Sequence, residues 1–132
     1  MIGIDTNIIV RLLTRDDAAQ FEAAVGLVKA SSAADPLFVN PMVISETLWV
    51  LERAYKVDRM TARNQMAGLL DSVEIKVPDL LHMEDWALWL TSTHSDFSDV
   101  VIAKLNIANG CKKTMTFDRR AANSVDGMEL LA

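Results

Sequence analysis

Along this chain, short runs of apolar residues alternate with segments whose apolar residues recur at helical spacing. The runs predict buried strands, and the helically spaced segments predict amphipathic helices. We expect strands at residues 2–4, 37–39, 74–77, 114–117 and 128–131. We expect helices at residues 6–14, 16–30, 41–55, 58–72, 79–92 and 97–109, with a short helix or turn at 118–124.

Local signals mark several ends of these elements. Asn40-Pro41 is a strong helix start, because asparagine caps free backbone amides and proline suits the first helical position. Gly110 directly follows an expected helix, where a left-handed cap is common. Strands that alternate with helices form a parallel sheet covered on both faces. The sequence therefore predicts the α/β class with a central parallel sheet.

The composition is that of one globular domain. The chain has 132 residues, a usual size for one domain, and no repeat, linker or low-complexity segment divides it. Hydrophobic residues make up 51% and charged residues 23%, which argues against a disordered tail. We therefore expect a single domain over residues 1–132.

Charge and hydropathy restrict the surroundings of the protein. The net charge of -5 gives no overall positive field, so a nucleic-acid backbone must meet a local group of Lys and Arg. The longest apolar stretch, "MVISETLWVL", is far shorter than the roughly 20 residues of a membrane span, and Asp5 interrupts any signal peptide. Cys111 is the single cysteine, which excludes an internal disulfide, and we expect it to be a small buried hydrophobe. These features predict a soluble cytoplasmic protein without a membrane partner.

Three acidic residues are expected at one edge of the sheet. Asp5 follows the first strand, and Asp118 directly follows the strand "TMTF". Asp99 begins a helix that carries the chain away by roughly 16 Å, and the strand "TMTF" returns it by roughly 13 Å. Ligand sites of open parallel sheets lie beyond the carboxyl ends of the strands. We therefore expect Asp5, Asp99 and Asp118 to lie close together.

Glu46 is a fourth acid of interest, because its helical neighbours one turn away are apolar. They are Met42, Val43, Trp49 and Val50. A carboxylate on an apolar face is unfavourable unless a cation or hydrogen bonds compensate its desolvation. Singly, each of the other acids also has a structural explanation, as a helix cap or a favourable first-turn charge. Their expected convergence is what favours a site.

Carboxylates gathered in one place need a counter-ion. Oxygen-only ligands favour Mg²⁺ or Mn²⁺ over zinc. His82 and His94 are too few and too scattered for a zinc site, and no glycine-rich phosphate loop occurs. The sequence thus predicts a hard divalent cation held by acids.

Five stretches resemble the motifs of one family in their order along the chain. They are "IDTNIIV", "VISETLWVL", "DFSDVVIAKLNIANG", "TFDRRAA" and "GMELL". On these motifs the chain resembles the PIN domains, and within them the VapC-like toxin ribonucleases of toxin-antitoxin pairs. The resemblance implies a three-layer α/β/α sandwich and a Mg²⁺-dependent endoribonuclease that cleaves RNA phosphodiester bonds with a metal-activated water. It also implies a homodimer and a cognate antitoxin.

The resemblance also assigns roles to residues. The catalytic, metal-binding acids fall on Asp5, Glu46, Asp99 and Asp118. Polar residues that orient them, with one additional acid, fall on Thr6, Asn7, Thr116 and Asp96. Within "DFSD" we expect Asp96 to cap the helix and Asp99 to be the principal ligand. Candidate RNA-binding cations, or simple solvated arginines, are Arg11, Arg15, Arg119 and Arg120.

Three other classes share part of the pattern. A phosphoryl-accepting signalling receiver would pair acids early in the chain and carry a lysine near the last strand, where this chain has Arg119-Arg120. A haloacid-dehalogenase-like phosphatase needs a second acid two positions after Asp5, where this chain has Asn7. A catalytically inactive interaction module would not need the complete set of acids. The pattern therefore favours a nuclease.

Overall fold

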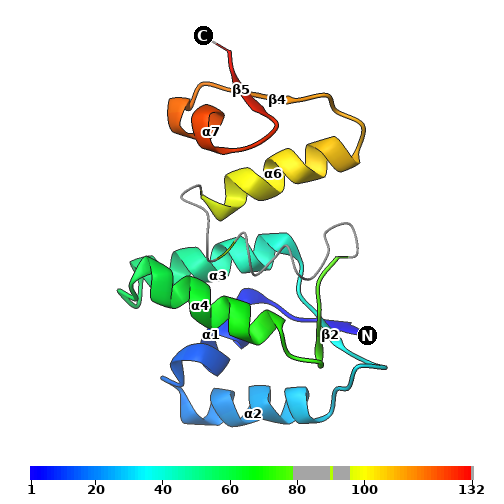
Figure 1. Ribbon diagram of the computed structural model, residues 1–132. Coiled ribbons are helices and arrows are strands. Elements are labelled where there is room, and N and C mark those ends of the chain that lie inside the picture. Colours follow the sequence, from blue (N-terminus) through cyan, green and yellow to red (C-terminus); the bar gives the residue numbers. More distant parts are fainter. Residues whose placement is uncertain (79–89, 91–95, 132) are drawn as a thin grey trace.

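The first part of the chain packs four helices beside a small parallel sheet. The computed structural model describes residues 1–78, 90 and 96–131. The elements in chain order are β1 (Ile2–Gly3), α1 (Thr6–Thr14), α2 (Ala18–Lys29), β2 (Leu37–Phe38), α3 (Pro41–Arg53), α4 (Arg59–Leu70) and β3 (Ile75–Lys76). The strands pair in parallel in the order β1-β2-β3 (Figure 1).

The last part of the chain forms a second, smaller parallel sheet. Its elements are α6 (Phe97–Ala108), β4 (Thr114–Thr116), α7 (Arg119–Ser124) and β5 (Met128–Leu130). Thr114 pairs with Met128, and Thr116 pairs with Leu130. Gly110 ends α6 with a φ of 91°, which confirms the predicted left-handed cap.

The α/β class with parallel strands is confirmed, and several predicted bounds agree with the structure. Helix α1 spans the predicted residues 6–14, while every strand is shorter than predicted. The helix expected at 79–92 falls almost wholly outside the described residues. In the described part of the chain the strands lie in two sheets and not in the single central sheet that we expected.

Local side-chain caps explain where the helices begin. The carboxylate of Asp17 accepts a hydrogen bond from the amide of Gln20 at 3.0 Å, and Asn40 accepts one from Val43 at 3.0 Å. Pro41 occupies the first turn of α3. The predicted helix start at Asn40-Pro41 is therefore confirmed, because capping depends on neighbours in the sequence.

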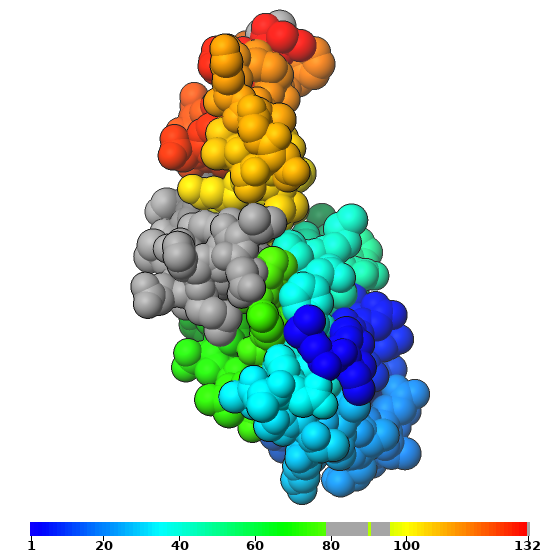
Figure 2. Space-filling model, turned by 90° about the vertical axis from the view of Figure 1, so that its right-hand side faces the viewer, coloured from blue at the N-terminus to red at the C-terminus, as the bar shows by residue number. Residues whose placement is uncertain are grey.

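Helix α6 separates the two sheets because it has an apolar face on each side. Phe97 and Val101, four positions apart, pack into the larger core with residues of α1, α3 and α4. Val100 and Ala103 pack instead against Val125, beside the second sheet. The molecule is consequently elongated, with β1 on one side of α3 and α6 and with β4 and β5 at the far end (Figures 1 and 2).

Two further observations concern the surface. Cys111, which we expected to be buried, is exposed in the turn between α6 and β4. It lies in this turn, where its amide donates to the carbonyl of Asn106 at 3.0 Å, and not on the apolar face of an element. Among the described helices, none has the length and apolar character required to cross a bilayer.

Candidate metal-binding acids

Asp5 and Glu46 meet at the start of α1, with Thr6 between them. The carboxylate of Asp5 caps α1 by accepting a hydrogen bond from the Thr6 amide at 2.7 Å. Thr6 is buried, and its Oγ1 donates to Oε2 of Glu46 at 2.8 Å. An open pocket of about 400 Å³ lies beside these residues and also reaches Asn7 and Tyr55. One threonine thus links the two carboxylates of this first acidic group.

Glu46 does not lie in the apolar surroundings that the sequence suggested. It is exposed, and its neighbours Met42 and Trp49 are 77% and 60% exposed. Helix α3 turns Ile44 and Leu51 into the core instead. The predicted apolar surroundings of Glu46 were therefore wrong, because this side of α3 faces solvent.

Asp99 and Asp118 form a second acidic group beside the smaller sheet. Asp118 caps α7 by accepting hydrogen bonds from the amides of Arg120 at 2.9 Å and Ala121 at 3.1 Å. Its own amide donates to Oγ1 of Thr116 at 3.0 Å. Burial raises the pKa of the half-buried Asp99, and the negative charges of Asp96 and Asp118 raise it further. A cation near these carboxylates would relieve their repulsion.

Asp96 occupies the predicted N-cap position of α6, but it does not act as a cap. Its side chain makes no capping hydrogen bond and instead accepts one from Nη2 of Arg59 at 2.9 Å. A charge-assisted hydrogen bond from a guanidinium is stronger than a hydrogen bond from a neutral backbone amide. This difference explains why Asp96 pairs with Arg59 and does not cap α6. The predicted capping role of Asp96 was therefore wrong.

The two acidic groups stay apart within one chain. Over residues 1–78, 90 and 96–131, no three His, Cys, Asp or Glu side chains converge closely enough to hold a metal ion. Asp5 and Glu46 belong to the part with the first sheet, whereas Asp99 and Asp118 belong to the part with the second. Carboxylate oxygens suit a hard divalent cation chemically, but one chain does not bring together the expected set of four.

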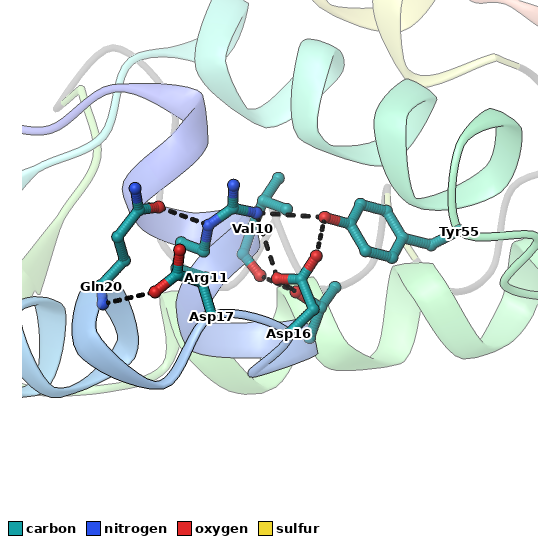
Figure 3. Close-up of polar contacts among 7 residues, drawn as sticks. Val10, Arg11, Asp16, Asp17, Gln20 and Tyr55 are labelled. Carbon is teal, nitrogen blue, oxygen red and sulfur yellow. Dashed lines mark hydrogen bonds and ion pairs between the residues drawn. The ribbon is translucent and has the colours of Figure 1, made fainter.

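Arg11, a candidate RNA-binding residue, is held inside a polar network. Its Nε donates to Gln20 at 2.6 Å, and its Nη1 donates to Asp16 and to the Tyr55 hydroxyl, both at 3.1 Å (Figure 3). The Tyr55 hydroxyl donates in turn to Asp16 at 2.6 Å. Hydrogen bonding to Tyr55 and the charge of Asp16 raise the pKa of Arg11. Its guanidinium therefore joins α1 to α2 and to the segment that follows α3.

The other candidate arginines differ in their surroundings. Arg15 ends α1 in the left-handed region, with a φ of 56°, and its guanidinium carbon lies 4.8 Å from the centre of the Phe21 ring. Arg119 and Arg120 are exposed and directly follow Asp118. Arg119 and Arg120 are therefore better placed than Arg15 to contact a ligand bound near Asp99 and Asp118.

A group of arginines that sequence reasoning missed lies beside Asp96. Arg53, Arg59 and Arg63 line a pocket of about 270 Å³ between α3, α4 and the start of α6, together with Trp49. Arg63 is buried and donates to the carbonyl of Leu90 at 3.2 Å, and burial lowers its pKa. Arg59 and Arg63 are four positions apart on one helix and are therefore neighbours on its surface. This spacing could have indicated the arginine group from the sequence.

Comparison with known proteins gives one result for the whole chain. The PIN domain family matches residues 2–127, from β1 to the turn before β5. A comparison with curated proteins found no match. PIN domains are generally nucleases, and they typically use divalent metal ions. On this match over nearly its full length, the chain belongs to the PIN domain family.

Proposed function

We propose that this protein is a Mg²⁺- or Mn²⁺-dependent endoribonuclease that acts as the toxin of a bacterial or archaeal toxin-antitoxin pair. Its family indicates a nuclease. The observation that supports a carboxylate site is that Asp5 and Asp118 each follow a parallel strand and each cap the next helix. This placement orients both carboxylates beyond the carboxyl ends of the strands, where ligands of parallel sheets bind.

In this proposal the metal ligands and catalytic acids are Asp5, Glu46, Asp99 and Asp118. Thr6 positions Glu46 through its hydroxyl, and Thr116 positions the backbone of Asp118. Asn7 lies in the first turn of α1, beside Asp5, with its side chain exposed. A bound divalent cation supplies Lewis acidity and lowers the pKa of a water.

An RNA substrate is compatible with the acidic chain only through local cations. Arg119 and Arg120 lie beside Asp118, and Arg53 lines the pocket that also contains Asp96. We propose that these arginines contact phosphates on either side of the acids. A single domain over residues 1–132, a cytoplasmic location, a homodimer and a cognate antitoxin belong to the same proposal.

The central test is RNA cleavage with purified protein in Mg²⁺, in Mn²⁺ and in EDTA, with DNA of the same sequence as a comparison. We expect internal cuts in RNA that need the metal, and growth arrest when the protein is expressed without its antitoxin. Asp5→Asn should lower cleavage by about 100-fold or more, because it removes a charged ligand. Cleavage that persists in EDTA would contradict the proposal.

The matched control is Asp17→Asn. Asp17 also caps a helix, accepting a hydrogen bond from Gln20 at 3.0 Å, but it lies at the start of α2, away from both acidic groups. This variant removes the same charge from the same kind of position. It should keep full activity, because asparagine preserves the cap. Equal loss in both variants would mean that the lost negative charge at a helix N-terminus, and not metal binding, explains the effect at Asp5.

A further inference from the structure

The pocket beside Asp96 lies where the second half of α3, the start of α4 and the start of α6 meet (Figure 1). Its volume is about 270 Å³, near the lower end of the range for small-molecule sites. Helix α3 supplies Trp49 and Arg53, and α4 supplies Arg59 and Arg63. The four proposed metal ligands are not among the residues that line it. The pocket is therefore separate from both acidic groups.

The lining of this pocket is positive although the chain as a whole is acidic. Arg53, Arg59 and Arg63 outnumber its two acids, Glu52 and Asp96, whereas the whole chain has a net charge of -5. Burial lowers the pKa of Arg63, and the positive charge of Arg59 lowers it further. The two guanidinium groups therefore repel each other, and a bound anion would relieve this repulsion.

The three arginines differ in what holds them. Arg59 pairs with Asp96 at 2.9 Å, and Arg63 donates to the carbonyl of Leu90 at 3.2 Å. Arg53 is exposed in the last turn of α3, and within the described residues its side chain makes no hydrogen bond or ion pair. Arg53 is thus the cation that can contact an incoming anion at the least cost to the fold.

The start of α6 adds to the positive potential of the pocket. Ser98, in the first turn of this helix, lines the pocket. Asp96 occupies the N-cap position but makes no capping hydrogen bond. The N-terminus of a helix carries a partial positive charge that favours phosphate groups. The helix start and the arginines therefore favour the same kind of ligand.

An aromatic ring lies beside these cations. Trp49 is 60% exposed and lines the pocket four positions before Arg53, so the two side chains are neighbours on one face of α3. Proteins that bind single-stranded nucleic acid combine an aromatic ring, on which a base stacks, with a cation that contacts the backbone. This pairing favours a nucleotide over a simple inorganic anion.

The pocket also lies close to the first acidic group. Glu46 precedes Trp49 by three positions and Arg53 by seven, which places all three on one side of α3. At 1.5 Å per residue, Trp49 is about 4.5 Å and Arg53 about 10.5 Å from Glu46 along the helix axis. A nucleotide in the pocket would therefore lie within one or two helical turns of Glu46.

We propose that this pocket binds one unpaired nucleotide of an RNA strand, with its base stacked on Trp49 and a phosphate at Arg53. The choice of RNA rests on the proposed function, whereas the nucleotide site itself does not depend on cleavage. A base inside a duplex is covered on both faces by its neighbours and cannot stack on a side chain. The pocket therefore gives the protein a preference for single-stranded RNA.

Photocrosslinking tests the stacking contact directly. The protein carries Asp5→Asn, so that RNA should stay intact, and the probe is a single-stranded RNA of mixed sequence that contains 5-iodouridine. This base crosslinks to aromatic side chains on irradiation, and mass spectrometry of the digested protein locates the modified residue. We expect a crosslink at Trp49. Crosslinks that map only to other residues would overturn the proposal.

Binding measurements in the same Asp5→Asn background test the preference for single strands. Trp49→Ala should weaken binding of the single-stranded RNA by about tenfold, and Trp49→Phe should retain most of the affinity, because phenylalanine keeps a stacking surface. Affinity for a duplex of the same sequence should not change. Unchanged affinity of Trp49→Ala for the single strand would overturn the proposal, and so would an equal loss for single strand and duplex.

Arg53→Ala has a matched control in Lys29→Ala. Arg53 and Lys29 are both exposed cations in the last turn of a helix, but Lys29 ends α2 and does not line the pocket. Arg53→Ala should decrease the slope of log affinity against log salt by about one, because one phosphate contact is lost. Lys29→Ala should leave the slope unchanged. Equal changes in both variants would overturn the role of Arg53.

Size-exclusion chromatography separates RNA binding from a protein contact, since tryptophan and arginine are also frequent in protein interfaces. We expect Trp49→Ala to elute as wild type does. If the variant eluted as a smaller species and bound single-stranded RNA with unchanged affinity, the pocket would be a protein contact and the proposal would be overturned.

These measurements also separate this inference from the proposed function. If wild-type protein cleaved no RNA but crosslinked through Trp49, the proposed nuclease activity would be wrong and the nucleotide site would stand. If wild-type protein cleaved RNA and Trp49→Ala bound and cleaved it equally well, the nucleotide site would be wrong and the nuclease would stand.

Discussion

The hydroxyl of Thr6 lies 2.8 Å from Oε2 of Glu46, across 40 positions of sequence. The amide of the same residue donates to the carboxylate of Asp5. Thr6 therefore touches both carboxylates of the first acidic group, and its burial restricts its side chain. The relative position of the two acids depends on this one residue.

Thr6→Val keeps the shape of the side chain but removes the hydrogen bond to Glu46. We expect the free energy of unfolding to fall by about 1 kcal/mol, as measured by urea denaturation. We also expect Mg²⁺ affinity to fall by about tenfold, as is usual when a residue that orients a ligand is lost. Thr6→Ser should retain both properties. Wild-type Mg²⁺ affinity in Thr6→Val would refute the positioning role.

Asp99→Asn should stabilise the metal-free protein at neutral pH. The pKa of Asp99 is raised by burial and by Asp96 and Asp118, so its charged form is unfavourable in the folded state. This destabilisation is present above the raised pKa and is relieved as the pH falls through it. In EDTA, the melting temperature of the variant should exceed that of wild type at pH 7, and the difference should shrink on acidification. A lower melting temperature at pH 7 would contradict this reasoning.

The same variant should lose its response to Mg²⁺, unlike Asp96→Asn. Wild-type protein should melt at a higher temperature in Mg²⁺, because a ligand that binds only the folded state stabilises it. Asp99→Asn should show almost no such increase and almost no cleavage. Asp96→Asn should keep a measurable part of both, since Asp96 already pairs with Arg59. Equal loss in the two variants would mean that both acids bind the metal.

Tyr55→Phe should weaken the contact between the end of α1 and the segment that follows α3. The hydrogen bond from the Tyr55 hydroxyl holds the pKa of Asp16 below its ordinary value. The hydrogen bond from Thr14 and the charge of Arg11 lower this pKa further. The stabilisation is therefore present above about pH 4 and is lost as the pH falls through the lowered pKa. We expect a lower urea midpoint than wild type at pH 7 and a smaller difference near pH 3. A difference that does not change with pH would exclude this role.

Arg119→Ala should weaken RNA binding when measured in an Asp5→Asn background that prevents cleavage. If Arg119 contacts one phosphate, the slope of log affinity against log salt should decrease by about one. Arg15→Ala is the matched control, because the Arg15 guanidinium already stacks on Phe21. The same slope change in both variants would show that only net charge matters.

The sequence by itself determined the features that depend on neighbouring residues. Asp5, Asn40 and Asp118 cap the helices that follow them, and α1 has its predicted bounds, because capping and periodicity act over a few positions. The α/β class and the family also followed from patterns that lie along the chain.

Only the tertiary structure decided which of these residues meet. The exposure of Glu46, the bond of Asp96 to Arg59 and the network around Arg11 all depend on helices distant in sequence. The separation of Asp5 from Asp118 likewise follows from α6, whose two apolar faces both find packing partners. Periodicity shows that a face is apolar, but the packing of the whole chain determines what covers it.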